Sequence, residues 1–153
     1  MKEPKQDKKS HSKPIFMQKI KTALLSYGMS GKVFHAPFLD LHSGFEITGA
    51  WERSKRLIQS DFPEVKSYAT LEALLQDDCD LVIVNTPVGT HYEYAKQVLL
   101  AGKHAIVEKA FTTTVAEAQE LDALANEKGL QLAVFQNRRW DSDFKTVQKI
   151  LQE

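Results

Sequence analysis

Three polar motifs, each placed directly after an apolar run, hold the residues of this 153-residue chain best suited to chemistry. Asn85-Thr86-Pro87 offers amide and hydroxyl groups, Glu108-Lys109-Ala110 a carboxylate beside an ammonium, and 136–140 amide, guanidinium and indole groups. Asn85, Thr86 and Glu108 can hydrogen-bond to ribose or carboxamide groups. Lys109 can polarise a substrate oxygen or assist proton transfer, which makes it the candidate catalytic residue. A solvated ion pair between Glu108 and Lys109 is the alternative.

A glycine-containing turn, Ser26-Tyr27-Gly28-Met29-Ser30-Gly31, follows the first apolar run. In a dinucleotide fingerprint, glycines allow a tight turn, close approach of the pyrophosphate and close packing of the next helix. The N–H groups at the start of that helix then face the phosphates. Gly28 and Gly31 occupy the second and third fingerprint positions, whereas Ser26 stands at the first, which predicts an altered turn or weaker phosphate binding. A plain strand-to-helix turn is the alternative.

Glu52 ends the second apolar run, about 20 residues beyond Gly31, at the spacing of a carboxylate that binds the adenosine ribose. A carboxylate there favours NAD because it repels a 2′-phosphate. Arg53, Lys55 and Arg56 lie beside it and can bind that phosphate instead. The expected cofactor is therefore NAD or NADP, with a lean to NAD. No pair of histidines has metal-ligand spacing with a third ligand, so no metal site is predicted.

The elements that must position these motifs alternate along the chain. Apolar runs predict strands, and periodic segments predict helices. The predicted strands are 20–26, 45–51, 80–85, 103–107 and 130–135, and the predicted helices are 30–41, 54–61, 71–76, 90–101, 114–128 and 141–151. Thr90 and Thr114, each with a glutamate three residues later, fit capping boxes, and Gly102 and Gly129 fit left-handed helix ends. This alternation predicts an α/β fold, a doubly wound parallel sheet of Rossmann type.

Bulk composition is typical of one soluble globular domain. The net charge is zero, with 20 basic and 20 acidic residues, which argues against a nucleic-acid partner. No apolar run approaches the roughly 20 residues of a membrane span. Cys79, the only cysteine, is expected to be a buried core residue in a reducing compartment, so a cytoplasmic location is predicted. Residues 1–18 are polar and predicted to be a disordered tail, followed by the domain at 19–153.

The ordered motifs resemble the N-terminal NAD(P)-binding domain of the Gfo/Idh/MocA oxidoreductase family over about Ile20 to Leu151. The matching segments are 27–37, 85–87 with 90–91, 101–104, 108–109 and 136–141. Together with the strand-end chemistry, the resemblance implies a cofactor-binding set of Gly28, Met29, Ser30, Gly31, Glu52, Arg53, Asn85, Thr86, Pro87, His91, Glu108, Lys109, Arg139 and Trp140. Within that set, Glu108 would hold the nicotinamide ribose and Lys109 would lie next to the substrate.

Ala110 departs from the family pattern, which has a proline after the glutamate and lysine, often linked through a cis bond. Alanine disfavours the cis form by about 2.5–4 kcal/mol, so relaxation to trans would turn Lys109 from its position. His35, on the first predicted helix, is expected to pack in the core or at the surface rather than to act in catalysis.

The resemblance also implies a C-terminal domain that binds substrate, supplies acid–base residues and forms the oligomer interface. That domain is expected to be absent from this chain, so a small-molecule substrate would bind only where the domain is present. The expected function is the nucleotide-binding domain of an NAD(P)-dependent oxidoreductase acting on a sugar, polyol or related hydroxy or carbonyl compound, inactive in isolation. The alternative is a non-enzymatic or degenerate dinucleotide-binding module from a truncated gene.

Overall fold

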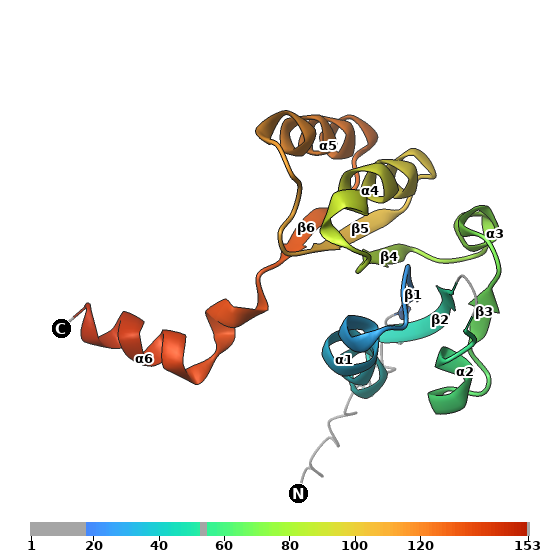
Figure 1. Ribbon diagram of the computed structural model, residues 1–153, viewed down its shortest axis with the longest axis horizontal. Helices are drawn as coiled ribbons and strands as arrows, with labels where there is room; N and C mark the ends of the chain where they lie inside the picture. The colour runs from blue at the N-terminus through green and yellow to red at the C-terminus, as the bar shows by residue number, and fades with distance from the viewer. Residues whose placement is uncertain (1–17, 53–54, 153) are drawn as a thin grey trace, which may run out of the picture.

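The computed structural model describes residues 18–52 and 55–152, which form one six-stranded sheet flanked by helices (Figure 1). The strands are β1 (Ile20–Leu24), β2 (Phe45–Trp51), β3 (Lys66–Tyr68), β4 (Leu81–Val84), β5 (His104–Glu108) and β6 (Leu132–Phe135). The helices are α1 (Ala36–Leu41), α2 (Ile58–Asp61), α3 (Leu71–Gln76), α4 (His91–Leu100), α5 (Val115–Lys128) and α6 (Ser142–Ile150). A π-helical segment (Gly31–His35) precedes α1, and 3₁₀ turns precede α4 (Val88–Thr90) and α6 (Asn137–Trp140).

All strand pairs are parallel, in the order β3-β2-β1-β4-β5-β6, which confirms the predicted doubly wound sheet. The strand order reverses between β1 and β4. Ligands of open α/β sheets bind outside the carboxyl ends of the strands at such a reversal. The glycine-containing turn, the Asn85 motif and the Glu108 motif all lie at this edge, because each directly follows one of the central strands.

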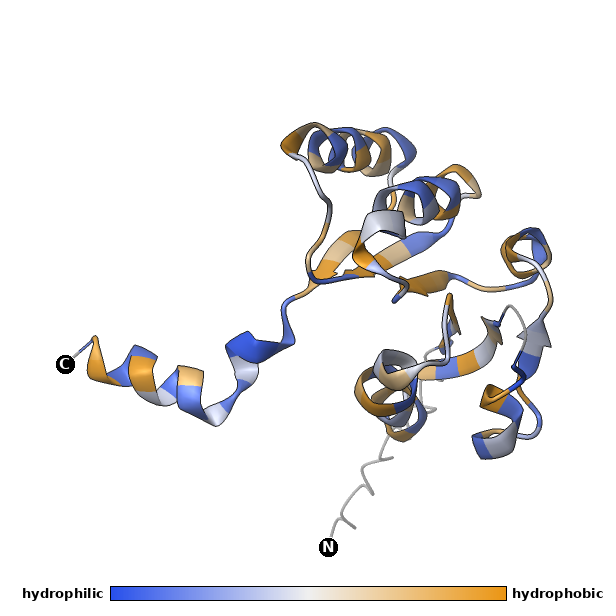
Figure 2. Cartoon of the chain, viewed as in Figure 1, coloured by the Kyte–Doolittle hydropathy of each residue, from blue (hydrophilic) through white to orange (hydrophobic). Residues whose placement is uncertain are grey.

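The core lies on both faces of the sheet, because side chains along a strand alternate in direction. Val82 and Val84 of β4 pack on one face in a cluster with Val98 of α4. Ile83 points to the other face, in a cluster with Leu39 of α1. β4 is therefore apolar along its whole length, as its orange colour in Figure 2 shows. A strand covered on both faces holds the reversal point rigidly.

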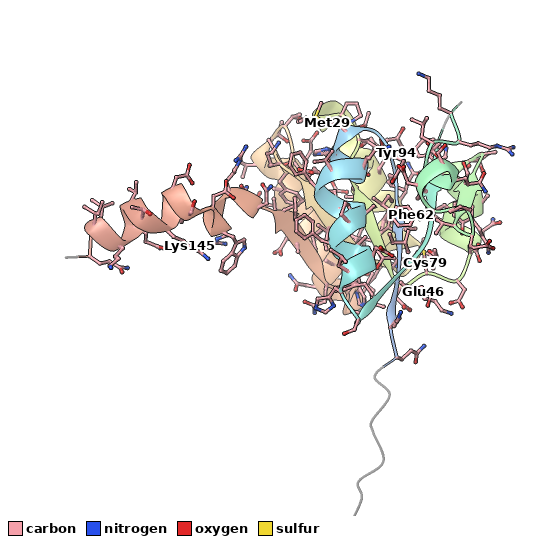
Figure 3. The ribbon with its side chains drawn as sticks, turned by 90° about the horizontal axis from the view of Figure 1, so that it is seen from below. Met29, Glu46, Phe62, Cys79, Tyr94 and Lys145 are labelled. Atoms are coloured by element: carbon pink, nitrogen blue, oxygen red, sulfur yellow. The ribbon has the colours of Figure 1, made fainter. Side chains whose placement is uncertain are left out.

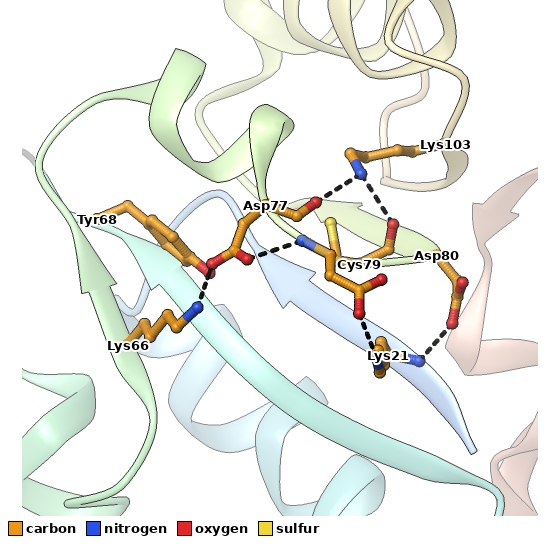
Figure 4. Close-up of polar contacts among 8 residues, drawn as sticks. Lys21, Lys66, Tyr68, Asp77, Cys79, Asp80 and Lys103 are labelled. Carbon is orange, nitrogen blue, oxygen red and sulfur yellow. Dashed lines mark hydrogen bonds and ion pairs between the residues drawn. The ribbon is translucent and has the colours of Figure 1, made fainter. Parts of the chain in front are cut away.

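A polar network closes the opposite edge of the sheet, where the strands begin (Figure 4). The buried ammonium of Lys103 donates to the carbonyl oxygens of Asp77 at 3.0 Å and Cys79 at 2.9 Å. Hydrogen bonds from Lys66 and Tyr68 hold the pKa of the Asp77 carboxyl far below its usual range. Cys79 is buried in the core, as the sequence predicts. This edge is stabilised internally, and the chemistry-bearing motifs lie at the other one.

Three helix ends match the sequence prediction. Thr114 and Glu117 form a reciprocal capping box at the start of α5. Gly102 and Gly129 have φ values of 76° and 65°, the left-handed conformation expected after α4 and α5. The capping box predicted at Thr90 is wrong, because a 3₁₀ turn precedes α4 and the Thr90 hydroxyl donates to the carbonyl oxygen of Pro87 at 2.7 Å.

Some other element boundaries differ from the predicted ones, and one strand was not predicted. β1 ends at Leu24 instead of residue 26, and the helix predicted over 54–61 begins at Ile58. β3 was not predicted, because Lys66–Tyr68 is short and contains no apolar run. The predicted tail falls, up to residue 17, outside the described residues. No helix in the described part of the chain is long and apolar enough to cross a membrane.

Candidate functional site

Two neighbouring pockets open at the carboxyl edge of the sheet. The Glu52 pocket, of about 270 Å³, has Ser26, Gly28, Trp51, Glu52, Lys55 and Thr86 among its lining residues. The Glu108 pocket, of about 330 Å³, has Ser30, Asn85, Thr86, Glu108, Lys109 and Arg138 among its lining residues. Thr86 borders both pockets, so they are neighbours, and the two together are called the recess. Figure 3 shows Met29 at this edge of the molecule and Glu46 at the opposite edge.

In the glycine turn, the backbone at Gly31 lies very close to the carbonyl group of Ser26. A Cβ atom on Gly31 would lie 2.4 Å from the carbonyl oxygen of Ser26, so only glycine fits there. A Cβ on Gly28 would meet nothing nearer than the Ser26 hydroxyl at 3.5 Å, which leaves the space over this residue open. Ser26, at the first fingerprint position, accepts a hydrogen bond from the Gly28 N–H at 3.2 Å through its hydroxyl oxygen. The serine therefore closes the turn through its side chain.

Asn85 joins the turn after β4 to the glycine turn. Its Nδ2 donates to the Ser26 carbonyl oxygen at 2.8 Å, and its side chain is buried. Its Oδ1 is buried without a hydrogen-bond partner among the described residues. A buried acceptor left unpaired costs about 1–3 kcal/mol. Because Asn85 also lines the Glu108 pocket, this unpaired oxygen is a candidate acceptor for a ligand there.

Glu108 has one acceptor position free. Its Oε1 accepts from the Ser30 hydroxyl at 2.6 Å and from His35 Nε2 at 2.9 Å, and its Oε2 accepts from the Lys109 N–H at 3.2 Å. A carboxylate has about four acceptor positions, so about one remains. Burial raises the pKa of the Glu108 carboxyl, but the hydrogen bonds from Ser30 and His35 outweigh burial, so the pKa lies below its ordinary value. The group is an ionised acceptor at the pocket.

His35 is a site residue that the sequence prediction missed. It is 4% exposed, and its ring packs on that of Phe135 with centroids 4.4 Å apart. Burial lowers the pKa of the imidazole, although Glu108 acts in the opposite direction. Ser30 and His35 are five residues apart, and they meet on Glu108 because the intervening segment is π-helical. A search for period 3.6 does not register that spacing.

Lys109 lies at the mouth of the Glu108 pocket. Its side chain is exposed, and its ammonium makes no ion pair with any described residue. The Lys109–Ala110 peptide bond is cis, although alanine disfavours that form, so the turn has not relaxed to trans. The Lys109 ammonium is therefore a cation without an ion-pair partner among the described residues, and it lines the same pocket as the ionised Glu108.

His91, predicted to line the cofactor, is buried and lines neither the Glu52 pocket nor the Glu108 pocket. His91 is 1% exposed, and its ring nitrogens lie 2.8 Å from the Ala110 carbonyl oxygen and 2.7 Å from that of Thr86. Both ring nitrogens are therefore used inside the protein. His91 links the loop after β4 to the loop after β5, so its contribution to the recess is positional.

Glu52, predicted to contact the adenosine ribose, lines its pocket and also accepts hydrogen bonds from within the protein. Its Oε1 accepts from the Leu57 N–H at 2.8 Å, and its Oε2 accepts from the Ile58 N–H at 3.2 Å and the Ser67 hydroxyl at 3.3 Å. The first N–H groups of a helix have no acceptor within the helix, and at α2 the Glu52 carboxylate accepts hydrogen bonds from two of them. Lys55, exposed beside it, makes no ion pair with a described residue. Arg53 lies outside the described residues.

Arg139 and Trp140 line a groove of about 740 Å³ on the α1 side of the sheet, with Phe38. Asn137 and Arg138 line this groove and also the Glu108 pocket. The 3₁₀ turn after β6 has about three residues per turn, so neighbouring side chains point in widely different directions. Asn137 and Arg138 are therefore the members of this motif that border the Glu108 pocket.

The remaining predicted residues lie at the recess. Met29 and Ser30 line the Glu108 pocket, Gly28 and Pro87 line the Glu52 pocket, and Thr86 lines both. Among the described residues, no group of three His, Cys, Asp or Glu side chains is placed to hold a metal ion.

Residues 20–136 match the family described as the oxidoreductase family with an NAD-binding Rossmann fold. The chain therefore belongs to the Gfo/Idh/MocA family of oxidoreductases, and its cofactor class is NAD or NADP. The match confirms the resemblance drawn from the motifs. It favours an oxidoreductase domain over the alternative of a degenerate module.

Relatives and solved structures agree with this assignment. The scyllo-inositol 2-dehydrogenase (NADP(+)) IolW of Bacillus subtilis is 42% identical over 135 residues, which cover 88% of this chain and 38% of IolW. An oxidoreductase from Bacillus cereus has a TM-score of 0.81 at 35% identity, over 88% of this chain and 39% of its own. KijD10, a 3-ketoreductase from Actinomadura kijaniata, was solved with TDP-benzene and NADP. It has a TM-score of 0.82 at 27% identity, and the match covers 88% of this chain and 44% of KijD10. The chain spans about two fifths of the length of these relatives.

Proposed function

We propose that this chain is the dinucleotide-binding domain of an NAD(P)-dependent oxidoreductase acting on a sugar, polyol or related hydroxy or carbonyl compound. The Glu108 pocket carries the proposal. It presents two acceptors, the unpaired Asn85 Oδ1 and the free position on Glu108, beside the ammonium of Lys109. The two hydroxyl groups of the nicotinamide ribose are the matching donors.

The adjoining turn fits the pyrophosphate of the same cofactor. The space over Gly28 is open, and a helical run begins shortly after it at Gly31, where helix N-termini favour phosphate groups. When bound, the nicotinamide supplies or accepts a hydride. Lys109 then polarises the substrate oxygen as its bond order changes. IolW is named as a dehydrogenase of a polyol and KijD10 as a ketoreductase, which supports a hydroxy or carbonyl compound as the substrate class.

Substrate recognition and oligomer contacts are proposed to reside in the part of the relatives that extends beyond the matched region. A pocket for the reacting carbon is needed because positioning supplies about 7–11 kcal/mol of the catalytic effect. The buried single cysteine supports a reducing, cytoplasmic location.

Direct titration of the chain tests the proposal. NADH or NADPH fluorescence is expected to change with saturation in the micromolar to sub-millimolar range, and Glu108→Gln is expected to weaken binding about tenfold because it removes a charged acceptor. ADP, which lacks the second ribose, should bind the variant as it binds the wild type. Absence of binding by both dinucleotides at millimolar concentration would contradict the proposal.

For the cofactor choice, NADP is favoured by Lys55. It lines the same pocket as Glu52, makes no ion pair with a described residue, and suits a 2′-phosphate. The Glu52 carboxylate accepts three hydrogen bonds, from the Leu57 and Ile58 N–H groups and the Ser67 hydroxyl, which leave about one acceptor position for a ribose 2′-hydroxyl. IolW is an NADP(+)-dependent enzyme by name, and KijD10 was solved with NADP, which adds support. This preference differs from the lean to NAD drawn from the sequence.

Lys55→Gln tests the cofactor choice. The loss of one charge-assisted contact is expected to weaken NADPH binding about tenfold and to leave NADH binding unchanged. Lys149→Gln on α6, which removes the same charge from an exposed site, is the matched control. Equal binding of NADH and NADPH by the wild type would refute the preference.

A further inference from the structure

His35 lies behind the Glu108 pocket and does not line it. The imidazole lines the groove on the α1 side of the sheet, while the carboxylate it contacts lines the pocket on the ligand side. Its Nε2 lies 2.9 Å from Glu108 Oε1, and the Ser30 hydroxyl lies 2.6 Å from the same oxygen. Two donors from one helical segment therefore fix one oxygen of a carboxylate that belongs to β5.

We infer that His35 is a positioning residue for the dinucleotide, resting on the proposed function of the Glu108 pocket. By donating through Nε2–H, it and Ser30 fill the acceptor positions of Oε1 and leave the free position of the carboxylate on Oε2. Oε2 is also anchored by the Lys109 N–H at 3.2 Å. The carboxylate plane is thereby held by three donors before any ligand arrives, and that preorganisation lowers the ordering cost of binding.

The placement of the ring explains why a histidine suits this position. Its face packs on the Phe135 ring, at a centroid distance of 4.4 Å and an interplanar angle of 47°, while its edge faces the carboxylate. The neutral ring with hydrogen on Nε2 meets both requirements, and burial favours that neutral form. A side chain with a ring but no donor would keep only the contact with Phe135, and one with a donor but no ring would keep only the hydrogen bond to Glu108. Mutation can therefore separate the two contacts.

Two variants separate the contacts. His35→Phe keeps an aromatic ring against Phe135 and removes the donor, whereas His35→Gln keeps a donor near the Nε2 position and removes the ring. His35→Phe is expected to weaken NADPH binding about tenfold, which corresponds to the loss of one hydrogen bond to a charged group. His35→Gln is expected to bind NADPH within about threefold of the wild type. Neither variant should change the affinity for ADP, which does not reach the Glu108 pocket.

The outcomes distinguish this inference from the proposed function. If the wild type binds neither NADH nor NADPH, the proposed function fails. If the wild type binds and His35→Phe binds NADPH equally well, or loses ADP affinity to the same degree, the positioning role is refuted. Equal weakening by His35→Gln and His35→Phe would also refute it. If His35→Phe does not fold, His35→Asn replaces it, because its shorter amide cannot reach Oε1 and should bind as weakly.

Discussion

Glu108 illustrates how single hydrogen-bond positions define this site. The carboxylate is held by a hydroxyl and an imidazole from one helical segment and by a main-chain N–H at the end of β5. What remains for a ligand is one acceptor position, next to the unpaired Oδ1 of Asn85. The site is therefore selective for a ligand that presents two donors, and the loss of one internal donor should change its affinity.

Gly31 gives a prediction about packing at the residue scale. Gly31→Ala is expected to cost about 1–3 kcal/mol of unfolding free energy, because its Cβ would lie 2.4 Å from the Ser26 carbonyl oxygen and the backbone must shift. Gly89→Ala is the matched control, since its Cβ would meet no atom within 4 Å. Urea denaturation measures both, and equal stability of the two variants would contradict the structure of the turn.

The pair His35 and Glu108 predicts a pH dependence of stability. The folded pKa of His35 lies below its ordinary value of 6.5, and that of Glu108 below 4.5, so both groups bind protons more weakly in the folded state than in the unfolded state. Stability is therefore present above these values, and it declines as the pH falls through about 6.5 and again below about 4.5. His35→Phe should have a shallower decline between pH 7.5 and 5.5 in urea titrations. Parallel curves for the variant and the wild type would count against this account.

At the scale of elements, the helix starts differ in how their N–H groups are satisfied. α5 uses a complete capping box, α2 uses Glu52 from the end of β2, and α4 follows a 3₁₀ turn without a side-chain cap. Glu52 also lines the pocket named after it, so the start of α2 takes up part of the acceptor capacity of a carboxylate at the recess.

Thr114→Ala tests the α5 cap. The loss of the side-chain acceptor should cost about 1 kcal/mol of unfolding free energy, within a range of about 0.5–2. Glu93→Ala on α4 serves as the comparison, because Glu93 is exposed and takes part in no cap, and its change should stay within about 0.5 kcal/mol. Denaturant melts of both variants measure the difference. A larger loss for Glu93→Ala would reverse the assignment.

At the scale of the whole molecule, the sheet has one edge stabilised internally and one edge with free acceptors and cations. The network around Lys103 and Asp77 closes the amino edge, and the recess formed by the Glu52 and Glu108 pockets opens at the carboxyl edge. α6 extends away from the sheet in Figure 1, with no buried side chain. Ligand binding should therefore act on the sheet and its loops, with little effect on α6.

Saturating cofactor is expected to stabilise the folded state as a whole. At a concentration one hundred times its Kd, NADPH should add about 2.7 kcal/mol to the free energy of unfolding. For a domain of this size, the gain corresponds to a rise in melting temperature of about 5–10 °C. Differential scanning fluorimetry with NADPH, and with free nicotinamide as a control, measures the rise. An unchanged melting temperature at saturation would be inconsistent with binding to the folded state.

The fold class was predictable because its signals are local and repeated. Apolar runs such as 81–84, capping residues such as Thr114 and positive-φ glycines such as Gly129 each depend on a few neighbouring residues. Their alternation specifies parallel strands with helical crossovers. The order of the polar motifs was sufficient to indicate the family, because each motif follows a strand.

The partners of the site residues were decided only by the tertiary structure. His35 and Glu108 are 73 residues apart, and they meet because a π-helical segment packs against β5. Glu52 accepts a hydrogen bond at the start of α2, and of the side chains that follow β6 only Asn137 and Arg138 line both the Glu108 pocket and the groove on the α1 side. Residue types and their order along the chain indicated which groups lie at the recess. Which of their atoms remain free for a ligand depends on long-range hydrogen bonds, and no local pattern encodes those bonds.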